Sequence, residues 1–263
     1  MSLAKHFAIG VVDSFAYLGS LAMTKEIRPP FLHTTPAGAI RKTVQDVISI
    51  QDRSFVVERP HSIDDVLDHP DTMVAFEQDE YMPYWADLWP SAEMLAAAIL
   101  EHSWSEPHEL TALEIGCGVG LSSLAALAVG MHVTMTDYDH TAVQFALRNA
   151  MVNGFQNVAG HALDWRHLSD EPRVHVLLAA DVLYERRNIE PIVNLIDQLL
   201  LPLGECWLTD PNRAHANEFQ QQLIHKGLCF ERTNVIRPAG NSNSRATVVH
   251  GSLYRIRHKR RPF

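Results

Sequence analysis

The chain has 263 residues, of which 46% are hydrophobic and 20% charged, so it can bury a full core as one large domain. Its formal net charge is −9, which argues against the basic groove that a nucleic-acid backbone requires, and we expect no nucleic-acid partner. The basic residues near the C-terminal end form a tail short enough to be a solvated chain end: Arg255, Arg257, Lys259, Arg260 and Arg261.

The first candidate element is an apolar stretch over residues 7–23. Asp13 and several small polar residues interrupt it, and it is shorter than the roughly 20 apolar residues that a transmembrane helix needs. The interruptions are also untypical of a secretory signal peptide. We therefore expect no membrane span, no secretory leader and a cytoplasmic protein.

A β-hairpin and a short helix are predicted next. Residues 43–58 alternate apolar and polar side chains on either side of a break at residues 51–53, which predicts the hairpin. Ser62 is a typical N-cap for the short apolar segment that follows it. These elements predict an N-terminal arm over residues 1–82 and a main domain over residues 83–263.

Helices and strands alternate through most of the main domain. Pro90 is typical of the first position of a helix, and a continuous apolar run such as residues 174–180 is typical of a buried central strand. Because helices separate most of these strands, right-handed crossovers and a mostly parallel sheet are predicted. The predicted strands are 111–115, 132–136, 157–163, 174–180 and 205–209, and the predicted helices after residue 110 are 119–128, 141–152, 189–201 and 214–226.

The last two predicted strands are residues 228–236 and 246–256, around a turn-rich segment at 240–243. No helix separates these two strands, so we expect them to pair antiparallel. The predicted fold class is therefore α/β. We expect a Rossmann-like, seven-stranded, mostly parallel sheet with helices on both faces and the last strand antiparallel, together with the N-terminal arm of hairpin and helix.

The glycine-rich segment 113–120, Leu-Glu-Ile-Gly-Cys-Gly-Val-Gly, lies where the first strand of the main domain passes into a helix. Glycines there allow a tight turn and let a ligand approach the main chain closely. A phosphate-binding loop needs a lysine that this segment lacks, and a dinucleotide site needs GxGxxG rather than GxGxG. An adenosylmethionine site is the third interpretation, because Glu114 suits the cationic amino-acid end of that ligand. An ordinary strand-to-helix turn remains an alternative.

Two acids follow the second of these strands. Asp137 comes 21 residues after Gly116, a spacing at which a carboxylate reaches both hydroxyl groups of a bound ribose. The alternative role for Asp137 is the N-cap of the next helix, and Asp139 can fill that role equally well. Because both acids are present, one is available for each task, which favours Asp137 as a ribose ligand.

Two further pairs of an acid and an aromatic residue follow later strands. Asp164 can accept a hydrogen bond from an adenine amino group, and Trp165 can pack on the ring, although a tryptophan is more often part of a core. Asp181 and Tyr184 follow the buried strand at 174–180 and project toward one cleft. Asp181 can orient an incoming ammonium and Tyr184 can form an aromatic wall, whereas a helix cap and a core tyrosine are the alternative.

An aromatic cluster precedes the helix that Pro90 opens. Tyr84, Trp85 and Trp89 lie within six residues of one another. The cluster either attaches the N-terminal arm to the main domain or forms a lid over a bound cofactor.

The cysteines and histidines give no sign of a metal site. Cys117, Cys206 and Cys229 include no CxxC pair, and the 15 histidines include no HExxH motif. A sparse, odd set of cysteines suits a reducing compartment and argues against a disulfide framework and a zinc site.

Taken together, these motifs resemble the seven-strand lysine methyltransferases, the group that includes the enzyme for the electron-transfer-flavoprotein β subunit. They are also similar to bacterial proteins of the nicotinamide N-methylase-like type. The resemblance extends from about Thr43 to the C-terminus. Its specific marks are the W-x-x-x-W-P segment at 85–90, the pair 164–165, the [DE]-x-x-[YF] motif at 181–184 and a DPxR-like segment at 210–213.

The resemblance implies a class I methyltransferase that uses S-adenosylmethionine, releases S-adenosylhomocysteine and needs no metal. It implies a protein substrate with an accessible lysine as the methyl acceptor, and a small amine or other metabolite is the alternative acceptor. We expect Asp181 and Tyr184 to be catalytic. The residues expected to bind the cofactor are Trp89, Glu114, Gly116, Cys117, Gly118, Asp137, Tyr138, Asp164, Trp165 and Ala180.

Two other classes of protein remain as alternatives. A non-catalytic binding module can keep this fold, but the intact glycines, Asp137 and the pair Asp181–Tyr184 argue against it. A nicotinamide-dependent oxidoreductase is the other class, and tight binding of NADH would favour it.

Overall fold

A computed structural model describes residues 33–36, 38–167, 171–238 and 248–259. The apolar stretch 7–23, the turn-rich segment 240–243, and Arg260 and Arg261 lie outside these described residues. Among the helices of the described residues, none is both long and apolar enough to cross a membrane.

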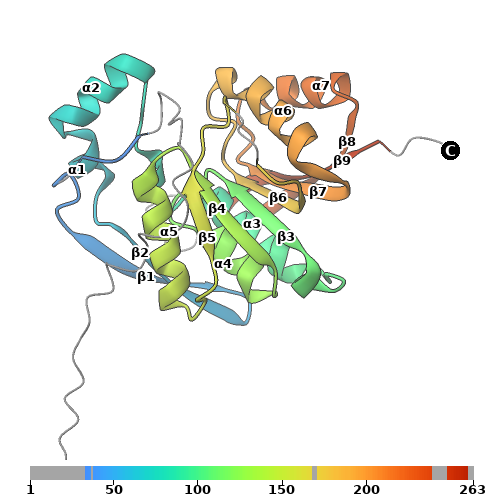
Figure 1. Ribbon diagram of the computed structural model, residues 1–263, viewed down its shortest axis with the longest axis horizontal. Helices are drawn as coiled ribbons and strands as arrows, with labels where there is room; N and C mark the ends of the chain where they lie inside the picture. Colours follow the sequence, from blue (N-terminus) through green and yellow to red (C-terminus); the bar gives the residue numbers. More distant parts are fainter. Residues whose placement is uncertain (1–32, 37, 168–170, 239–247, 260–263) are drawn as a thin grey trace, which may run out of the picture.

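The centre of the molecule is a seven-stranded sheet with the spatial order β5-β4-β3-β6-β7-β9-β8 (Figure 1). Neighbouring strands from β5 to β7 pair in parallel, whereas β9 pairs antiparallel with both β7 and β8. The predicted sheet, with its last strand antiparallel, is therefore confirmed. The strands are β3 (Thr111–Ile115), β4 (His132–Asp137), β5 (Ala159–Ala162), β6 (Val174–Ala180), β7 (Leu200–Asp210), β8 (Leu228–Pro238) and β9 (Val248–His258).

Helices cover both faces of this sheet, as predicted. One hydrophobic core lies between the sheet and α3, α4 and α5, and the other lies between the sheet and α6 and α7. Adjacent residues of β6 alternate between them, since Leu178 belongs to the first core and Leu177 to the second. The helices are α3 (Pro90–Glu101), α4 (Leu121–Ala128), α5 (His140–Val152), α6 (Ile189–Leu199) and α7 (Ala216–His225).

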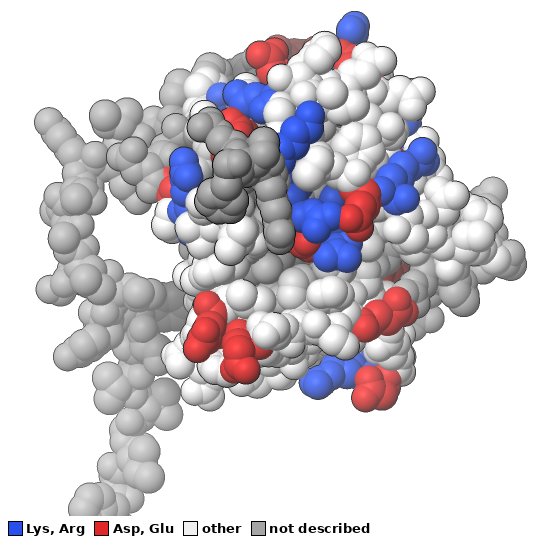
Figure 2. All heavy atoms as spheres, turned by 90° about the vertical axis from the view of Figure 1, so that its right-hand side faces the viewer, with Lys and Arg blue, Asp and Glu red and all other residues white. Residues whose placement is uncertain are grey.

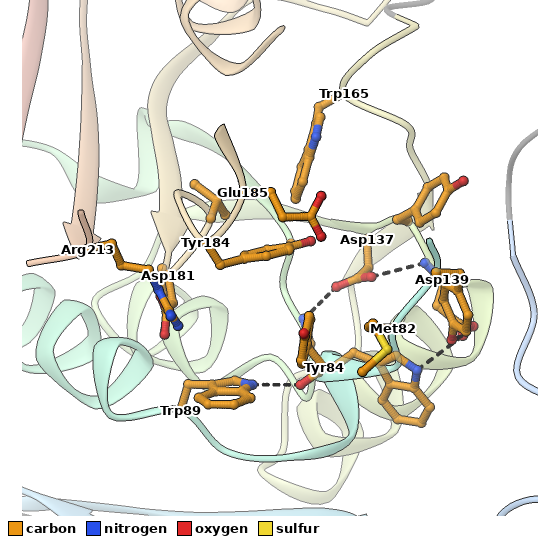
Figure 3. Close-up of a pocket in the computed structure, with 17 residues that line it drawn as sticks. Met82, Tyr84, Trp89, Asp137, Asp139, Trp165, Asp181, Tyr184, Glu185 and Arg213 are labelled. Carbon is orange, nitrogen blue, oxygen red and sulfur yellow. Dashed lines mark hydrogen bonds and ion pairs between the residues drawn. The ribbon is translucent and has the colours of Figure 1, made fainter. Parts of the chain in front are cut away.

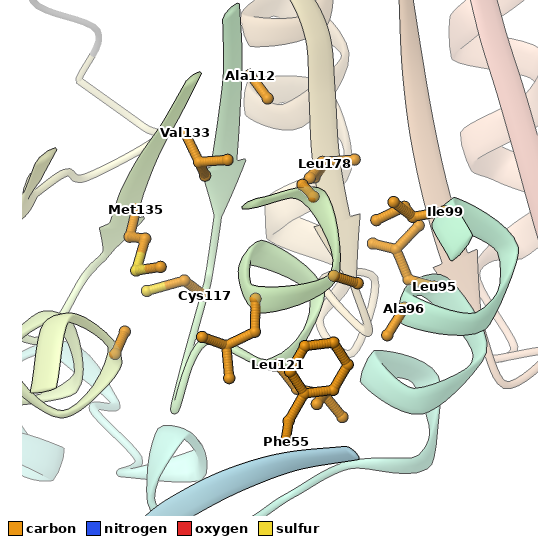
Figure 4. Close-up of a cluster of buried hydrophobic side chains, with 14 of the residues drawn as sticks. Phe55, Leu95, Ala96, Ile99, Ala112, Cys117, Leu121, Val133, Met135 and Leu178 are labelled. Atoms are coloured by element: carbon orange, nitrogen blue, oxygen red, sulfur yellow. The ribbon is translucent and has the colours of Figure 1, made fainter. Parts of the chain in front are cut away.

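The N-terminal hairpin is confirmed and lies against the first core. Its strands β1 (Thr43–Ile50) and β2 (Arg53–Pro60) pair antiparallel, and Figure 1 shows them on the opposite side of the molecule from β8 and β9. Phe55 of β2 packs into the cluster beside Leu121 of α4 (Figure 4). The hairpin therefore buries apolar surface of the helix that follows the glycine-rich turn.

Two asparagines, one in α5 and one at the C-cap of that helix, bind the backbone of β2 as a neighbouring strand would. The side-chain amide of Asn149 accepts from the N–H of Glu58 at 2.8 Å and donates to its carbonyl at 2.9 Å. Asn153 does the same at Val56, accepting at 3.0 Å and donating at 2.7 Å. An amide group carries both a donor and an acceptor, so these bonds satisfy the main chain of β2 on the side where the described part of the chain offers it no strand partner.

Between the hairpin and α3 lie two helices, of which the sequence predicted one. Ser62 caps α1 (Ile63–Leu67) by accepting from the N–H of Asp64 at 3.1 Å, as predicted. The second, α2 (Pro70–Asp79), was not predicted, because its apolar residues show little helical periodicity and its N-cap is a histidine, His69. The short 3-10 helices are Tyr84–Ala86, Pro107–Glu109 and Arg186–Asn188.

Candidate active site

A cavity of about 270 Å³ opens at the carboxyl ends of β3, β4 and β6 (Figure 3). This edge is where ligands bind in open parallel sheets. Most of the residues predicted for the site line it: Trp89, Gly116, Gly118, Asp137, Tyr138, Trp165, Ala180, Asp181 and Tyr184. Tyr84 and Trp85, of the aromatic cluster that the sequence offered as a lid, also line the cavity. Lining residues that were not predicted for the site are Tyr81, Met82, Asp139, Val182, Glu185 and Arg213.

The glycine-rich turn presents its main chain to this cavity. Gly116 has φ +61°, and a Cβ there would lie 3.2 Å from the ring of Trp165 and 3.2 Å from a methyl group of Val182. A side chain at this position would therefore strain the backbone and close the space beneath Trp165. The side chain of Cys117 lies in the first core, so the turn exposes backbone rather than a thiol (Figure 4).

Glu114 is not among the residues that line the cavity. Its buried carboxylate turns toward α4, where it accepts from the N–H of Ser123 at 3.0 Å and from the hydroxyl of the same residue at 2.5 Å. Burial raises the pKa of Glu114 to about 7, although these hydrogen bonds oppose the rise. Contact between Glu114 and a cofactor stays a prediction.

Asp137 and Asp139 divide the two tasks that the sequence suggested for them. The Asp137 carboxylate lies in the cavity and accepts from the N–H of Gly118 at 2.9 Å and of Asp139 at 3.0 Å. Burial raises the pKa of Asp137 to about 6, against the effect of these hydrogen bonds. Asp139 caps α5 by accepting from the N–H of Thr141 at 2.7 Å. Each oxygen of Asp137 still has a lone pair for a ribose hydroxyl.

A polar network that sequence reasoning missed surrounds Asp139. Its Oδ2 accepts from the Thr35 hydroxyl at 2.7 Å, from the Trp85 indole at 3.1 Å and from the Tyr81 hydroxyl. Burial and the charge of Asp139 raise the pKa of Tyr81. The sequence pattern explained Asp139 as a helix cap. It gave no sign that donors from distant segments also bind this carboxylate.

Asp164 and Trp165 differ in their position relative to the cavity, since only Trp165 lines it. The Trp165 ring lies over Gly116 and lines the cavity. Asp164 is buried beside it and accepts from Arg166 at 2.8 Å, and it lies 2.9 Å from Nδ1 of His167. Burial opposes ionisation of Asp164, but these hydrogen bonds outweigh it and hold the pKa below its usual range. The guanidinium of Arg166 also lies 4.8 Å from the ring centre of Tyr138.

Asp181 is buried at the opposite side of the cavity from Asp137, and its partner is a resident arginine. Its Oδ1 accepts from Nε of Arg213 at 2.7 Å, and its backbone N–H donates to the carbonyl of Thr209 at 2.9 Å. Asp181 has φ +58°, a left-handed conformation that a non-glycine residue adopts at some cost and that aims its side chain into the cavity. This hydrogen bond and the negative charge of Asp181 raise the pKa of Arg213.

Three aromatic rings line the space between the two acids (Figure 3). Tyr84 packs edge-to-face on both Trp89 and Tyr184, with ring centres 6.0 and 5.3 Å apart. The Trp89 indole donates to the carbonyl of Tyr84 at 2.6 Å, which holds that ring in place. The aromatic cluster before α3 therefore lines the cavity, and burial raises the pKa of Tyr184.

The chain is similar to known methyltransferases. A family model described as lysine methyltransferase matches residues 69–225. The histone-arginine methyltransferase METTL23 of Xenopus laevis is 28% identical over 134 residues, which are 48% of this chain and 57% of that protein. The histidine protein methyltransferase 1 homolog of Dictyostelium discoideum is 30% identical over 105 residues, which are 36% of this chain and 33% of that protein. The chain thus spans about half the length of the first relative and a third of the second.

A solved structure shares the fold. The magnesium protoporphyrin IX methyltransferase of Synechocystis, solved with bound S-adenosylmethionine, superposes with a TM-score of 0.50 at 16% identity, over 63% of this chain and 77% of that one. The segment matched by the family model covers more than half of the chain and includes everything from β3 to α7, with most of the cavity between them. The protein therefore belongs to the lysine methyltransferase family.

Proposed function

We propose that this protein transfers a methyl group from S-adenosylmethionine to the side-chain amine of a protein lysine. The observation that carries the proposal is the cavity itself. It brings the glycine turn and Asp137 together on one side, and Asp181 and Tyr184 on the other. These are the two sets of groups that a nucleoside donor and an amine acceptor need.

The donor half of the site suits a nucleoside with a cationic end. Asp137 accepts the two ribose hydroxyls, and the backbone of Gly116 and Gly118 allows close approach of the ligand. The Trp165 ring over Gly116 offers an apolar face for packing against the nucleoside. The fold shared with a methyltransferase solved with bound S-adenosylmethionine also supports this donor.

Methyl transfer to an amine depends more on how the protein positions the acceptor nitrogen than on a strong base. Bound S-adenosylmethionine supplies a methyl carbon whose bond to sulfur breaks, with the electron pair staying on sulfur, as the acceptor nitrogen forms the new bond. The acceptor ammonium, with a pKa of ~10.4 in solution, first loses a proton to water. Asp181 holds the nitrogen at the cavity, and Tyr84, Trp89 and Tyr184 exclude water and stabilise positive charge near their faces.

A protein acceptor is favoured by the relatives, whose names describe methylation of histone arginine and of protein histidine. The family description favours lysine among the basic side chains. The net charge of −9 favours a cationic partner. On the face seen in Figure 2, acidic side chains lie among the basic ones, an arrangement that suits a protein surface better than a polyanion.

The test has a binding step and a transfer step. Titration calorimetry with S-adenosylhomocysteine should give saturable binding to one site. Incubation of a host lysate with the protein and labelled S-adenosylmethionine should then label protein lysines, with the methylated residue located by mass spectrometry. A matched reaction with Asp137→Ala controls for other methyltransferases of the lysate. Absence of binding would refute the proposal, label on arginine or histidine would replace the acceptor, and label confined to small molecules would favour a metabolite methyltransferase.

A further inference from the structure

A second cavity shares a wall with the first. It is more open, encloses about 520 Å³, and lies between the start of α3 and the loop after β7. Four residues line both cavities: Trp89, Asp181, Tyr184 and Arg213. The outer cavity is completed by Pro90 and by residues of the loop 211–215.

We propose that this outer cavity is the entrance for the acceptor lysine and that Arg213 closes it by occupying the cation site at Asp181. The incoming ammonium replaces the Arg213 guanidinium at the Asp181 carboxylate. This inference rests on the proposed function, because it names how the acceptor reaches the same site.

The two-cavity arrangement fits the geometry of methyl transfer. In an in-line displacement, the acceptor nitrogen approaches the methyl carbon from the side opposite to the sulfur. The inner cavity contains Asp137 and the glycine turn, which are the donor side of the proposed site. An acceptor that enters from the outer cavity therefore meets the donor across the shared wall, at Asp181 and Tyr184.

Arg213 is the member of the wall best able to move. The side chain of Asp181 is short, and 7% of it is exposed. Trp89 is held by its indole bond to Tyr84. By contrast, 34% of the Arg213 side chain is exposed, and a long flexible stem joins its guanidinium to the main chain.

An exchange of cations keeps the buried carboxylate paired while the acceptor enters, until the ammonium gives up the proton whose loss precedes transfer. Leaving Asp181 without a partner would be costly, because a buried charge is stable only when it is paired. The ammonium of lysine brings one positive charge to Asp181 as the guanidinium, which carries the same charge, moves away. Pro90, Pro211 and Ala214 offer apolar contacts for the methylene stem that follows the ammonium inward. The acceptor class is therefore an unbranched alkylammonium on an extended chain.

The proposal that the Arg213 guanidinium competes with the acceptor for Asp181 is tested with Arg213→Gln and Arg213→Lys. The acceptor probe is N-α-acetyl-lysine N-methylamide, assayed at saturating S-adenosylmethionine. Arg213→Gln removes the competing cation, so we expect the KM for this probe to fall about tenfold, whereas Arg213→Lys should stay near the wild-type value. Arg186→Gln is the matched control, because Arg186 pairs with Glu218 at 2.8 Å outside both cavities. An unchanged or higher KM in Arg213→Gln would refute the proposal that Arg213 closes the entrance.

The route is tested separately with Ala214→Trp, which fills the outer cavity at an exposed position. We expect the KM for the probe to rise at least about tenfold, while the Kd for S-adenosylhomocysteine, measured by calorimetry, stays within about twofold of wild type. Retained cofactor affinity also shows that the variant is folded. An unchanged KM in Ala214→Trp would refute the entrance while leaving the proposed function intact. If the wild type binds the nucleoside but methylates neither the probe nor any protein lysine, the proposed function fails and this inference fails with it.

Discussion

The backbone N–H of Asp139 donates to the carboxylate of Asp137 at 3.0 Å, so that two acids two residues apart are held with different orientations. Asp139 turns to the start of α5 and to the buried donors Thr35 and Trp85. Asp137 turns into the cavity. One acid thus stabilises the fold around the site while the other stays available to a ligand.

Replacement of Asp137 by asparagine should weaken cofactor binding selectively. The amide keeps the size of the side chain but removes the charge that two ribose hydroxyls would meet, which costs about 1–3 kcal/mol of binding free energy. Calorimetric titration of S-adenosylhomocysteine into both proteins measures the difference. Asp52→Asn, on the exposed hairpin turn, serves as the matched control. Equal affinity of Asp137→Asn and wild type would remove Asp137 from the ribose site.

Cofactor affinity should also depend on pH through the same residue. Burial raises the pKa of Asp137 to about 6 in the free protein, and ribose hydroxyls donate to the ionised form. The Kd for S-adenosylhomocysteine should therefore be constant well above pH 6 and rise by up to about tenfold per pH unit as the pH falls below it. The dependence should disappear in Asp137→Asn. A Kd that stays flat in the wild type down to about pH 5 would contradict the assignment.

Asp181→Asn should have the opposite signature to Asp137→Asn. Asparagine tolerates the left-handed conformation at this position, so the backbone is expected to stay in place. Loss of the carboxylate removes the group that holds the acceptor nitrogen. Methyl transfer should fall by about 10²-fold or more while the Kd for S-adenosylhomocysteine stays nearly unchanged. Wild-type turnover in this variant would exclude Asp181 from the mechanism.

Much of the fold was predictable, because the β-strands and helices carry their own periodicities. The apolar run of β6, the proline at the start of α3 and the glycine turn after β3 each identify an element from local residues alone. The helix α2 carries no such local signal, and its exposed Met73, Val74 and Phe76 blur its periodicity. The division of the chain at residue 83 stays a prediction.

The partners of the site residues were less predictable, because they come from distant segments. Arg213 pairs with Asp181 across 32 residues, and Tyr81 reaches Asp139 across 58. Glu114 was expected to face the cofactor, but its direction depends on Ser123 of α4, which the turn brings beneath β3. Residue types and strand ends thus indicate which acids reach the edge of the sheet. Which of them is already paired depends on the tertiary structure.

Glu114 should make the protein less stable as the pH rises. Its pKa is about 7 in the folded chain against 4.5 in the unfolded one, so folding favours the protonated form. The stabilisation is fully present below about pH 4.5 and is lost as the pH rises through about 7, which amounts to on the order of 3 kcal/mol. Glu114→Gln should flatten the free energy of unfolding over this range. The exposed Glu109→Gln is the control, and equal pH dependence of the two variants would contradict the role of burial.

Gly120 and Gly154 allow the packing at the glycine turn to be measured apart from backbone strain. Both have φ +89°, so alanine at either position adopts a left-handed conformation at a cost of about 1–2 kcal/mol. A Cβ at Gly120 would also lie 2.9 Å from the Cβ of Ala146 on α5, whereas a Cβ at Gly154 meets nothing within 4 Å. Gly120→Ala should therefore lose about 1–3 kcal/mol more than Gly154→Ala in denaturant unfolding, because α4 must move away from α5. Equal losses would mean that α4 and α5 adjust freely, and the close approach of these helices would then not depend on a glycine.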